Sequence, residues 1–145
     1  MHKDVMQSNA TGYDLVVVLE QLVTLLRQVS VAGGLSTAAS SALHRLGRDG
    51  PHRLTELANA QGVSQPGMTQ LVARMEREGL VRRTASGDDR RAVLVEATRA
   101  GLDLVERRRT ERADALQYLL DRLDPADRDA IAAALPALGH LVEAR

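Results

Sequence analysis

The stretch from Leu54 to Glu96 constrains the fold of this chain more than any other part of the sequence. It contains two segments with helical spacing of apolar residues, followed by two short β-prone runs. Gly62 separates the helical segments and suits a sharp turn, because glycine takes a left-handed backbone conformation without a Cβ penalty. We therefore predict two short helices joined by a tight turn and followed by a β-hairpin.

Both predicted helices have recognisable starts and apolar faces. Thr55 is the expected N-cap of the first, whose small apolar face includes Leu57 and Ala58. Ser64 is the expected N-cap of the second, with Pro66 in the first turn, where a missing amide hydrogen costs nothing. The residues expected to face inward from the second helix recur at three- and four-residue spacing and are Met68, Leu71, Val72 and Met75.

The opposite face of the second helix consists of polar and small residues that can enter a DNA major groove. Glutamine can bond adenine bidentately there, and arginine can bond guanine. The residues of this face are Gln65, Gly67, Thr69, Gln70, Ala73, Arg74 and Arg77. Amphipathic helix pairs with a glycine turn also occur in all-α proteins that bind no DNA, so the helix pair alone leaves both interpretations open.

A predicted β-hairpin favours the DNA-binding interpretation. Gly79 ends the second helix, the runs Leu80 to Thr84 and Arg91 to Glu96 have strand character, and Ser86-Gly87 marks the turn between them. The expected fold class is mainly α with a small β-hairpin wing, the outline of a winged helix-turn-helix.

Charged residues near the hairpin tip extend the predicted DNA contact. Arg90 and Arg91 are expected to enter the flanking minor groove or to clamp phosphate, and Asp89 to orient an arginine through a charge-assisted pair. The alternative for Asp89 and Arg91 is a hairpin-stabilising salt bridge with no role in DNA binding, worth only ~0.2 to 1 kcal/mol when exposed.

The order of these motifs resembles the MarR (multiple-antibiotic-resistance regulator) family of winged-helix transcription factors. The resemblance runs from about Leu35 to the C-terminus. Its specific part is a wing motif Asp-x-Arg, a short apolar strand and a Thr-x-x-Gly helix start, which here are Asp89, Arg91, Val93 to Val95, Thr98 and Gly101. The sequence departs from the family at Ala97, where a leucine is usual. Gly67 costs ~1 kcal/mol relative to alanine, and either allows close approach to DNA or is tolerated near the helix start.

The resemblance implies a homodimer whose two recognition helices enter successive major grooves of a pseudo-palindromic operator, and it makes Arg91 the wing arginine. It also implies a small amphipathic or phenolic effector, bound between the dimer helices and the DNA-binding part, that releases DNA. The sequence marks such a pocket weakly, because Trp and Phe are absent; Met6, Arg27 and His44 are candidate lining residues.

The absence of cysteine, phenylalanine and tryptophan restricts both the core and the chemistry. Aliphatic side chains and alanine must build the core, which favours helix. A chain without cysteine forms no disulfide and cannot sense oxidants through a thiol. The apolar run Leu15 to Leu19 is far too short to span a bilayer and no signal peptide is recognisable, so we expect a cytoplasmic location and no membrane partner.

The formal net charge is zero, but the charges are unevenly distributed. Residues 35–91 hold nine arginines against six acidic residues, whereas residues 113–145 hold three arginines against six. Positive charge therefore concentrates in the half predicted to bind DNA, although solvated surface helices can show a similar imbalance by chance.

Apolar helices are predicted at both ends of the chain. The first runs from Thr11 to Val31 after a frayed or arm-like start, and its apolar residues cover too many faces for one stripe. Such a helix is buried on more than one side, most simply against a second subunit; the alternative is a central core helix of a monomer. The last helix opens at Asp124-Pro125 and has a narrow seam suited to a partner helix, formed by Ile131, Leu135, Leu138 and Val142.

Two further helices complete the expected fold. One runs from Ser36 to Leu46, and the other from Thr98 to about Leu123. Residues 106–112 of the longer helix are polar on every face, as expected where a helix crosses solvent. The basic residues around Gly50-Pro51 form either a phosphate-binding or a solvated loop; they are Arg45, Arg48, His52 and Arg53.

These predictions divide the chain into an N-terminal dimerisation helix (1–34), a winged helix-turn-helix DNA-binding domain (35–97) and C-terminal dimerisation helices (98–145). The predicted function is a homodimeric, sequence-specific transcriptional regulator, more specifically a repressor released by a small molecule. The alternative is a winged-helix module for protein assembly, against which the arginines of the wing argue. No catalytic triad, phosphate-binding glycine loop or metal-ligand cluster has useful spacing, so we expect no enzyme, metal or cofactor.

Overall fold

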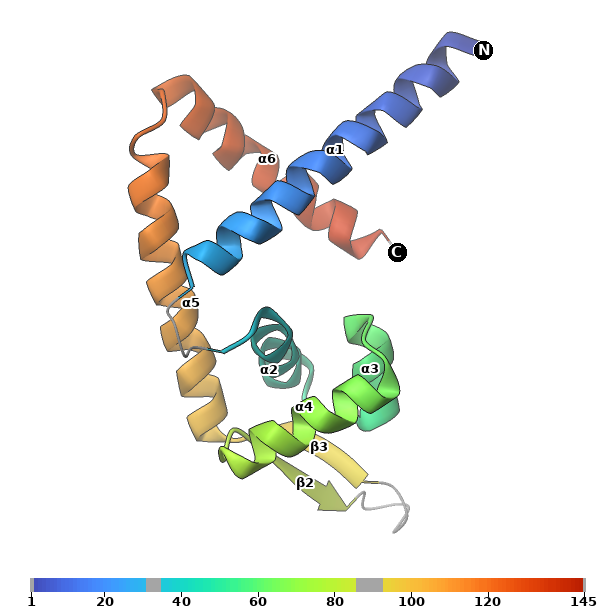
Figure 1. Ribbon diagram of the computed structural model, residues 1–145, viewed down its shortest axis with the longest axis vertical. Helices are drawn as coiled ribbons and strands as arrows, with labels where there is room; N and C mark the ends of the chain where they lie inside the picture. Colours follow the sequence, from blue (N-terminus) through green and yellow to red (C-terminus); the bar gives the residue numbers. More distant parts are fainter. Residues whose placement is uncertain (1, 31–34, 86–92, 145) are drawn as a thin grey trace.

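The computed structural model describes residues 2–30, 35–85 and 93–144, with side chains from Thr11 onward. Its elements are α1 (His2–Gln28), α2 (Thr37–Asp49), β1 (His52–Arg53), α3 (Leu54–Gln61), α4 (Gln65–Arg77), β2 (Val81–Ala85), β3 (Val93–Ala97), α5 (Arg99–Leu120) and α6 (Pro125–Glu143). Figure 1 shows α2, α3, α4 and the strands gathered at one end of the molecule, with α5 leading from them toward α1 and α6. We call residues 35–85 and 93–105 the reading head.

Aliphatic side chains and methionine build the core of the reading head. Met68, Val72 and Met75 of α4 are fully buried on the face predicted to point inward, and Leu71 is half-buried. Burying each such side chain contributes roughly 1.5–3 kcal/mol. The other buried apolar residues come from α2, α3, the sheet and the first turns of α5, and are Ala39, Ala42, Leu43, Leu46, Leu57, Ala58, Leu80, Val81, Val95 and Val105.

The start of α5 is fixed to the reading head by a close backbone approach at Gly101. A Cβ on Gly101 would lie 2.1 Å from the carbonyl oxygen of Leu80, so only glycine permits this contact. Thr98 caps the helix, as predicted: its Oγ1 accepts a 3.1 Å hydrogen bond from the Gly101 amide and donates one of 2.6 Å to the Gly79 carbonyl.

The sheet has the strand order β1-β3-β2 and is antiparallel throughout. The β2–β3 hairpin confirms the predicted wing strands, whose described ends are displaced by one residue; the predicted turn Ser86-Gly87 and the strand start at Arg91 lie outside the described residues. β1 was not predicted: the interpretation of His52 and Arg53 as loop residues is wrong, because they pair with Val95 and Leu94 of β3. A strand of two residues has no periodicity of its own and exists only through its partner strand.

The turn and cap predictions for the helix pair are confirmed with one exception. Gly62 ends α3 in a left-handed conformation (φ 62°), and Ser64 Oγ accepts a 3.1 Å hydrogen bond from the Gly67 amide at the start of α4. Thr55 is not the N-cap of α3. That position is Arg53, whose amide donates a 3.4 Å hydrogen bond to Glu56 Oε2, because β1 delivers the chain directly into a helix that begins at Leu54.

The terminal helices α1 and α6 differ from the other helices in the exposure of their described side chains. α1 begins at His2, so the predicted frayed start before Thr11 is wrong; no glycine or proline precedes Gly12, and the helix continues through it. None of the described side chains of α1 or α6 is buried, and apolar residues such as Leu22 and Leu135 are 50% and 60% exposed. The central-core alternative for α1 is therefore wrong. No helix in the described part of the chain is long and apolar enough to cross a membrane.

Candidate nucleic-acid interface

α4 presents one polar face to solvent. Its predicted DNA-facing residues Gln65, Thr69, Gln70, Arg74 and Arg77 are all exposed, while Gly67 and Ala73 are half-buried beside them. Thr69 Oγ1 donates a 2.8 Å hydrogen bond to the Gln65 carbonyl, which leaves its methyl group and a lone pair available. The structure thus brings the predicted recognition residues onto one accessible surface, and their role in DNA binding stays a prediction.

Gly67 has a local structural reason. A Cβ at this position would lie 3.0 Å from Ser64 Oγ and 3.3 Å from Val63 Cγ1. Because the Gly67 amide donates to that same serine oxygen, a larger residue would crowd the cap that starts α4. These contacts give the glycine a role at the helix start, and its close approach to DNA stays a prediction.

Three arginines around α4 and the hairpin form ion pairs with carboxylates, which the sequence analysis missed. Arg74 Nε lies 3.4 Å from Glu78 Oε1, one turn along α4. Arg83 Nε of β2 lies 3.5 Å from Glu76 Oε2 of α4. Arg82 pairs with Glu96, directly opposite on β3. The four-residue spacing of Arg74 and Glu78 is visible in the sequence, whereas the Arg83–Glu76 contact depends on how β2 packs against α4.

Asp89, Arg90 and Arg91 lie outside the described residues, so their predicted contacts rest on the sequence alone. The described part of the hairpin exposes Arg82 and Arg83 on β2. Exposed arginines therefore continue from α4 onto the first wing strand.

The basic residues around Gly50-Pro51 are engaged in local contacts. Arg48 and Arg45 both approach Asp49, at 3.0 Å and 3.6 Å. The hydrogen bond from Arg48 lowers the pKa of the Asp49 carboxyl below its ordinary value. His52 Nδ1 donates a 2.7 Å hydrogen bond to the Gly50 carbonyl. These pairings favour a structural role over phosphate binding for this segment.

A hollow of about 400 Å³ lies where α1, α2 and α5 meet. It combines the apolar side chains Leu26, Ala113 and Leu116 with the cationic Arg109 and Arg112 and the hydroxyls of Thr37, Ser40 and Ser41. His44 also lines it, and its Nε2 is buried without a hydrogen-bond partner among the described residues. Burial first, and then the Arg109 guanidinium, lower the pKa of His44 below its ordinary value; Glu106 opposes this shift and Arg112 adds to it.

The middle of α5 is exposed on one side, as predicted, but its other side packs against the reading head. Arg112 Nη1 lies 3.4 Å from Ser40 Oγ of α2, and Arg108 and Glu111 are half-buried and paired at 2.9 Å. Arg112 reaches α2, and the Nε atom of Arg108 is buried, which a polar sequence pattern alone does not reveal. Of the candidate effector residues, His44 lines the hollow, Arg27 does not, and the side chain of Met6 lies outside the described residues.

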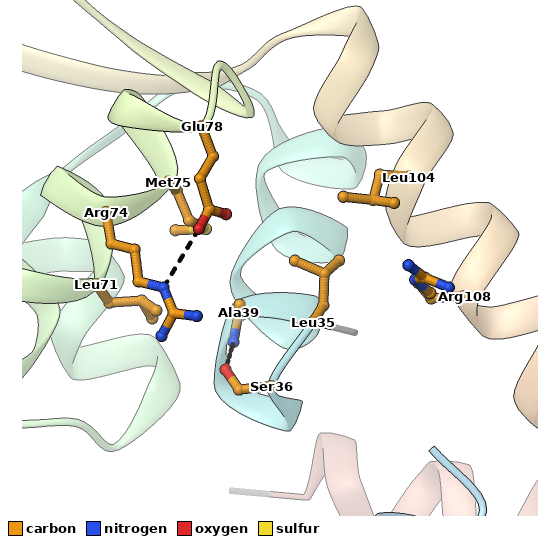
Figure 2. A pocket seen from close by; sticks show the side chains of 9 residues that line it. All are labelled: Leu35, Ser36, Ala39, Leu71, Arg74, Met75, Glu78, Leu104 and Arg108. Carbon is orange, nitrogen blue, oxygen red and sulfur yellow. Dashed lines mark hydrogen bonds and ion pairs between the residues drawn. The ribbon is translucent and has the colours of Figure 1, made fainter. Parts of the chain in front are cut away.

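A second, smaller hollow of about 100 Å³ lies behind α4 (Figure 2). Leu71, Arg74 and Met75 of α4, with Glu78 just after it, form one side, and the start of α2 with Leu104 and Arg108 of α5 forms the other. Figure 2 shows the Arg74 guanidinium and the Glu78 carboxylate meeting at the α4 side. Arg74 therefore borders both this hollow and the outer face of α4.

Comparison with known proteins also indicates a transcriptional regulator. The sequence model of the MarR family matches residues 33–92. An HTH-type transcriptional regulator of Mycobacterium tuberculosis is 30% identical over 130 residues, which cover 90% of this chain and 91% of that protein.

Two solved structures show the fold in known regulators. A mutant of MarR from E. coli has a TM-score of 0.76 at 21% identity, covering 88% of this chain and 94% of that chain, a likeness that shows the fold alone. BpsR of Bordetella bronchiseptica, whose DNA binding is regulated by 6-hydroxynicotinic acid, has a TM-score of 0.65 at 26% identity and covers 89% and 98%. These relatives are transcriptional regulators rather than enzymes, and the chain belongs to the MarR family of winged-helix regulators.

Proposed function

We propose that this protein is a homodimeric transcriptional regulator that binds a pseudo-palindromic operator through α4. The observation that carries the proposal is the two-sided character of this helix: Met68, Val72 and Met75 are buried, whereas Gln70 and Arg74 face solvent. An inner face that anchors the helix to the core, with an outer face of amide and guanidinium donors, matches what a major groove can accept.

The outer residues of α4 divide by position. Gln65, Thr69 and Gln70 lie on the first half of the helix, which in helix-turn-helix complexes reaches base edges. We assign base contacts to these residues and to Arg74. Arg77, in the last turn, is assigned a phosphate contact, since it forms no ion pair with any described residue.

The wing supplies a second contact. Arg90 and Arg91 would enter the flanking minor groove or bind phosphate, with Asp89 orienting an arginine. The family's Asp-x-Arg motif supports this role, and the exposed Arg82 and Arg83 provide neighbouring positive charge on β2. The same arginines disfavour a purely protein-binding wing, which would be expected to expose apolar side chains.

The terminal helices are proposed to bind a second copy of the chain. α1 spans 27 residues, about 40 Å of helix, and α6 spans 19. The described side chains of both helices include many exposed apolar residues, more than soluble monomers usually leave uncovered. A second copy of the chain would cover these residues and would also complete the DNA-binding surface, because two-fold symmetry presents two α4 helices to one operator. Residues 1–34 and 98–145 would thus serve dimerisation, and residues 35–97 DNA binding.

The hollow between α1, α2 and α5 is the proposed effector site. Two guanidiniums, serine and threonine hydroxyls and an apolar wall suit a small aromatic acid. BpsR, a relative of this fold, is regulated by such a molecule, 6-hydroxynicotinic acid. Because the hollow joins the dimer helix α1 to α2 of the reading head, a bound ligand would alter the spacing of the two heads and release DNA. The regulator would then act as a repressor.

Selection of genomic fragments with the purified full-length chain tests the proposal. Bound fragments should share an inverted repeat with half-sites about 10 base pairs apart, and affinity should fall steeply with salt. Arg74→Ala should lower operator affinity by about ten-fold or more, roughly the value of one bidentate base contact. Arg122→Ala, which removes an exposed arginine near the α5–α6 turn, should leave affinity unchanged. Recovery of fragments without a common sequence, or no loss with Arg74→Ala, would contradict the proposal.

A further inference from the structure

The arginines of the proposed DNA-facing surface are accompanied by carboxylates on the same surface. Arg74 is 68% exposed, yet its Nε is held 3.4 Å from Glu78, and Arg83 is held 3.5 Å from Glu76. Both glutamates are themselves exposed and lie at the C-terminal end of α4. A duplex that reaches Arg74 therefore also meets the carboxylate that holds it.

Helix stability does not account for these glutamates. The C-terminal end of a helix carries partial negative charge, so acidic side chains in the last turn are unfavourable by about 0.3–1 kcal/mol. An exposed ion pair returns only ~0.2–1 kcal/mol. The two effects are similar in size and opposite in sign, which leaves little net stabilisation of the isolated protein. The consequence of these charges lies instead in what approaches the surface.

Glu76 and Glu78 pair with arginines on different parts of the proposed DNA-binding surface. Glu78 follows α4 by one residue, and its carboxylate meets the Arg74 guanidinium beside the hollow behind the helix, as Figure 2 shows. Glu76 joins the last turn of α4 to Arg83 on β2, so it spans recognition helix and wing. The third pair, Arg82 with Glu96, joins neighbouring strands of one hairpin and has a half-buried glutamate, which fits a structural pair.

We propose that Glu78 is a positioning residue that sets the ratio of operator binding to non-specific DNA binding. The proposal rests on the DNA-binding function proposed above. Non-specific duplex offers Arg74 only phosphate, and exchanging a carboxylate for a phosphate gains little while bringing two anions close together. An operator also offers Arg74 a base edge, and a bidentate base contact compensates for the loss of the ion pair with Glu78. The Glu78 carboxylate therefore weakens binding to random sequence more than binding to the operator.

Glu78→Gln and Glu76→Gln test this proposal, because glutamine keeps the size of the side chain and removes its charge. Affinity for a random duplex should rise about three- to five-fold for each variant at low salt, the scale of one exposed charge pair. In Glu78→Gln, affinity for the operator should rise by a smaller factor, so the specificity ratio falls. In Glu76→Gln, both affinities should rise alike, because its partner Arg83 has no assigned base contact. The freed arginine can neutralise one further phosphate, so the slope of log affinity against log salt should steepen by up to about 0.9.

Asp121→Asn is the matched control. Asp121 pairs with Arg128 at 4.0 Å at the α5–α6 junction, which Figure 1 places at the opposite end of α5 from the strands. It changes net charge by the same amount and should alter neither affinity nor salt slope. Equal increases for random and operator duplex in Glu78→Gln, or an unchanged salt slope, would overturn the inference while leaving the proposed function intact. A parent chain that binds no duplex would overturn both.

Discussion

The reading head and the terminal helices of this chain treat apolar side chains in opposite ways. In the reading head, leucine, valine and methionine residues from several helices and strands are buried against one another. In α1 and α6 a similar density of leucine and valine is left exposed, with none of the described side chains buried. The reading head is therefore self-sufficient within one chain, while the terminal helices have a surface that one chain alone does not cover.

The sharpest way to test the self-sufficiency of the reading head is Leu43→Ala. Leu43 is fully buried, so its truncation should lower the free energy of unfolding by about 2–5 kcal/mol. Chemical denaturation at several protein concentrations measures this loss. Leu135→Ala on α6, where the leucine is 60% exposed, is the comparison and should change stability mainly through the monomer–dimer equilibrium. Equal, concentration-independent losses would remove the distinction between the two regions.

Leu22→Asp tests the other side of the comparison. A charge in the exposed apolar face of α1 should weaken association at least ten-fold, which corresponds to about 1.4 kcal/mol, while the reading head stays folded. Analytical ultracentrifugation measures the association, and circular dichroism the fold. Val93→Asp is the control: Val93 is similarly exposed, at 49%, but lies on the wing, so it should not alter oligomeric state. If the parent chain itself sediments as a monomer, a second copy is not what covers α1.

Ser64→Ala tests whether the N-cap of α4 stabilises the reading head. Loss of the hydroxyl that accepts from the Gly67 amide should cost ~1 kcal/mol of stability. Ser64→Asp keeps an acceptor and places negative charge at the helix N-terminus, so it should restore stability. Thermal unfolding checks both variants. An alanine variant as stable as the parent would mean that packing alone holds this helix.

His44 provides the smallest predicted effect, at the junction between the two regions. Its folded-state pKa is lowered, so below the unfolded value of about 6.5 the unfolded chain binds more protons than the native one. Stability should therefore fall as pH decreases from about 6.5 through the lower folded pKa. His44→Gln should flatten this part of the stability profile. An unchanged profile in His44→Gln would contradict the burial-driven shift.

Local sequence patterns predicted the helix pair well because its determinants are local. Ser64, Gly62 and the spacing of Met68, Val72 and Met75 each act within one or two turns of helix, and the structure places all of them as expected. The same holds for Thr98 at the start of α5. These features place the candidate recognition residues on one exposed face.

What could not be predicted depends on contacts between distant segments. β1 exists only because His52 and Arg53 meet β3, and the N-cap of α3 moves from Thr55 to Arg53 as a result. The polar segment of α5 is packed against α2 through Arg112 and Ser40, which are far apart in sequence. The pairing of Arg83 with Glu76 likewise requires the packing of β2 on α4. The wing residues Asp89, Arg90 and Arg91 lie outside the described residues, so their predicted role still rests on sequence alone.

A hydroxyl-radical footprint of the purified chain on a selected genomic fragment tests the central claim most directly. The account predicts two protected patches, about 10 base pairs apart and related by the two-fold symmetry of the site, which disappear together in the monomeric Leu22→Asp variant. A single protected patch, or protection that survives unchanged in a variant shown to be monomeric, would contradict a two-headed reader held together by α1 and α6.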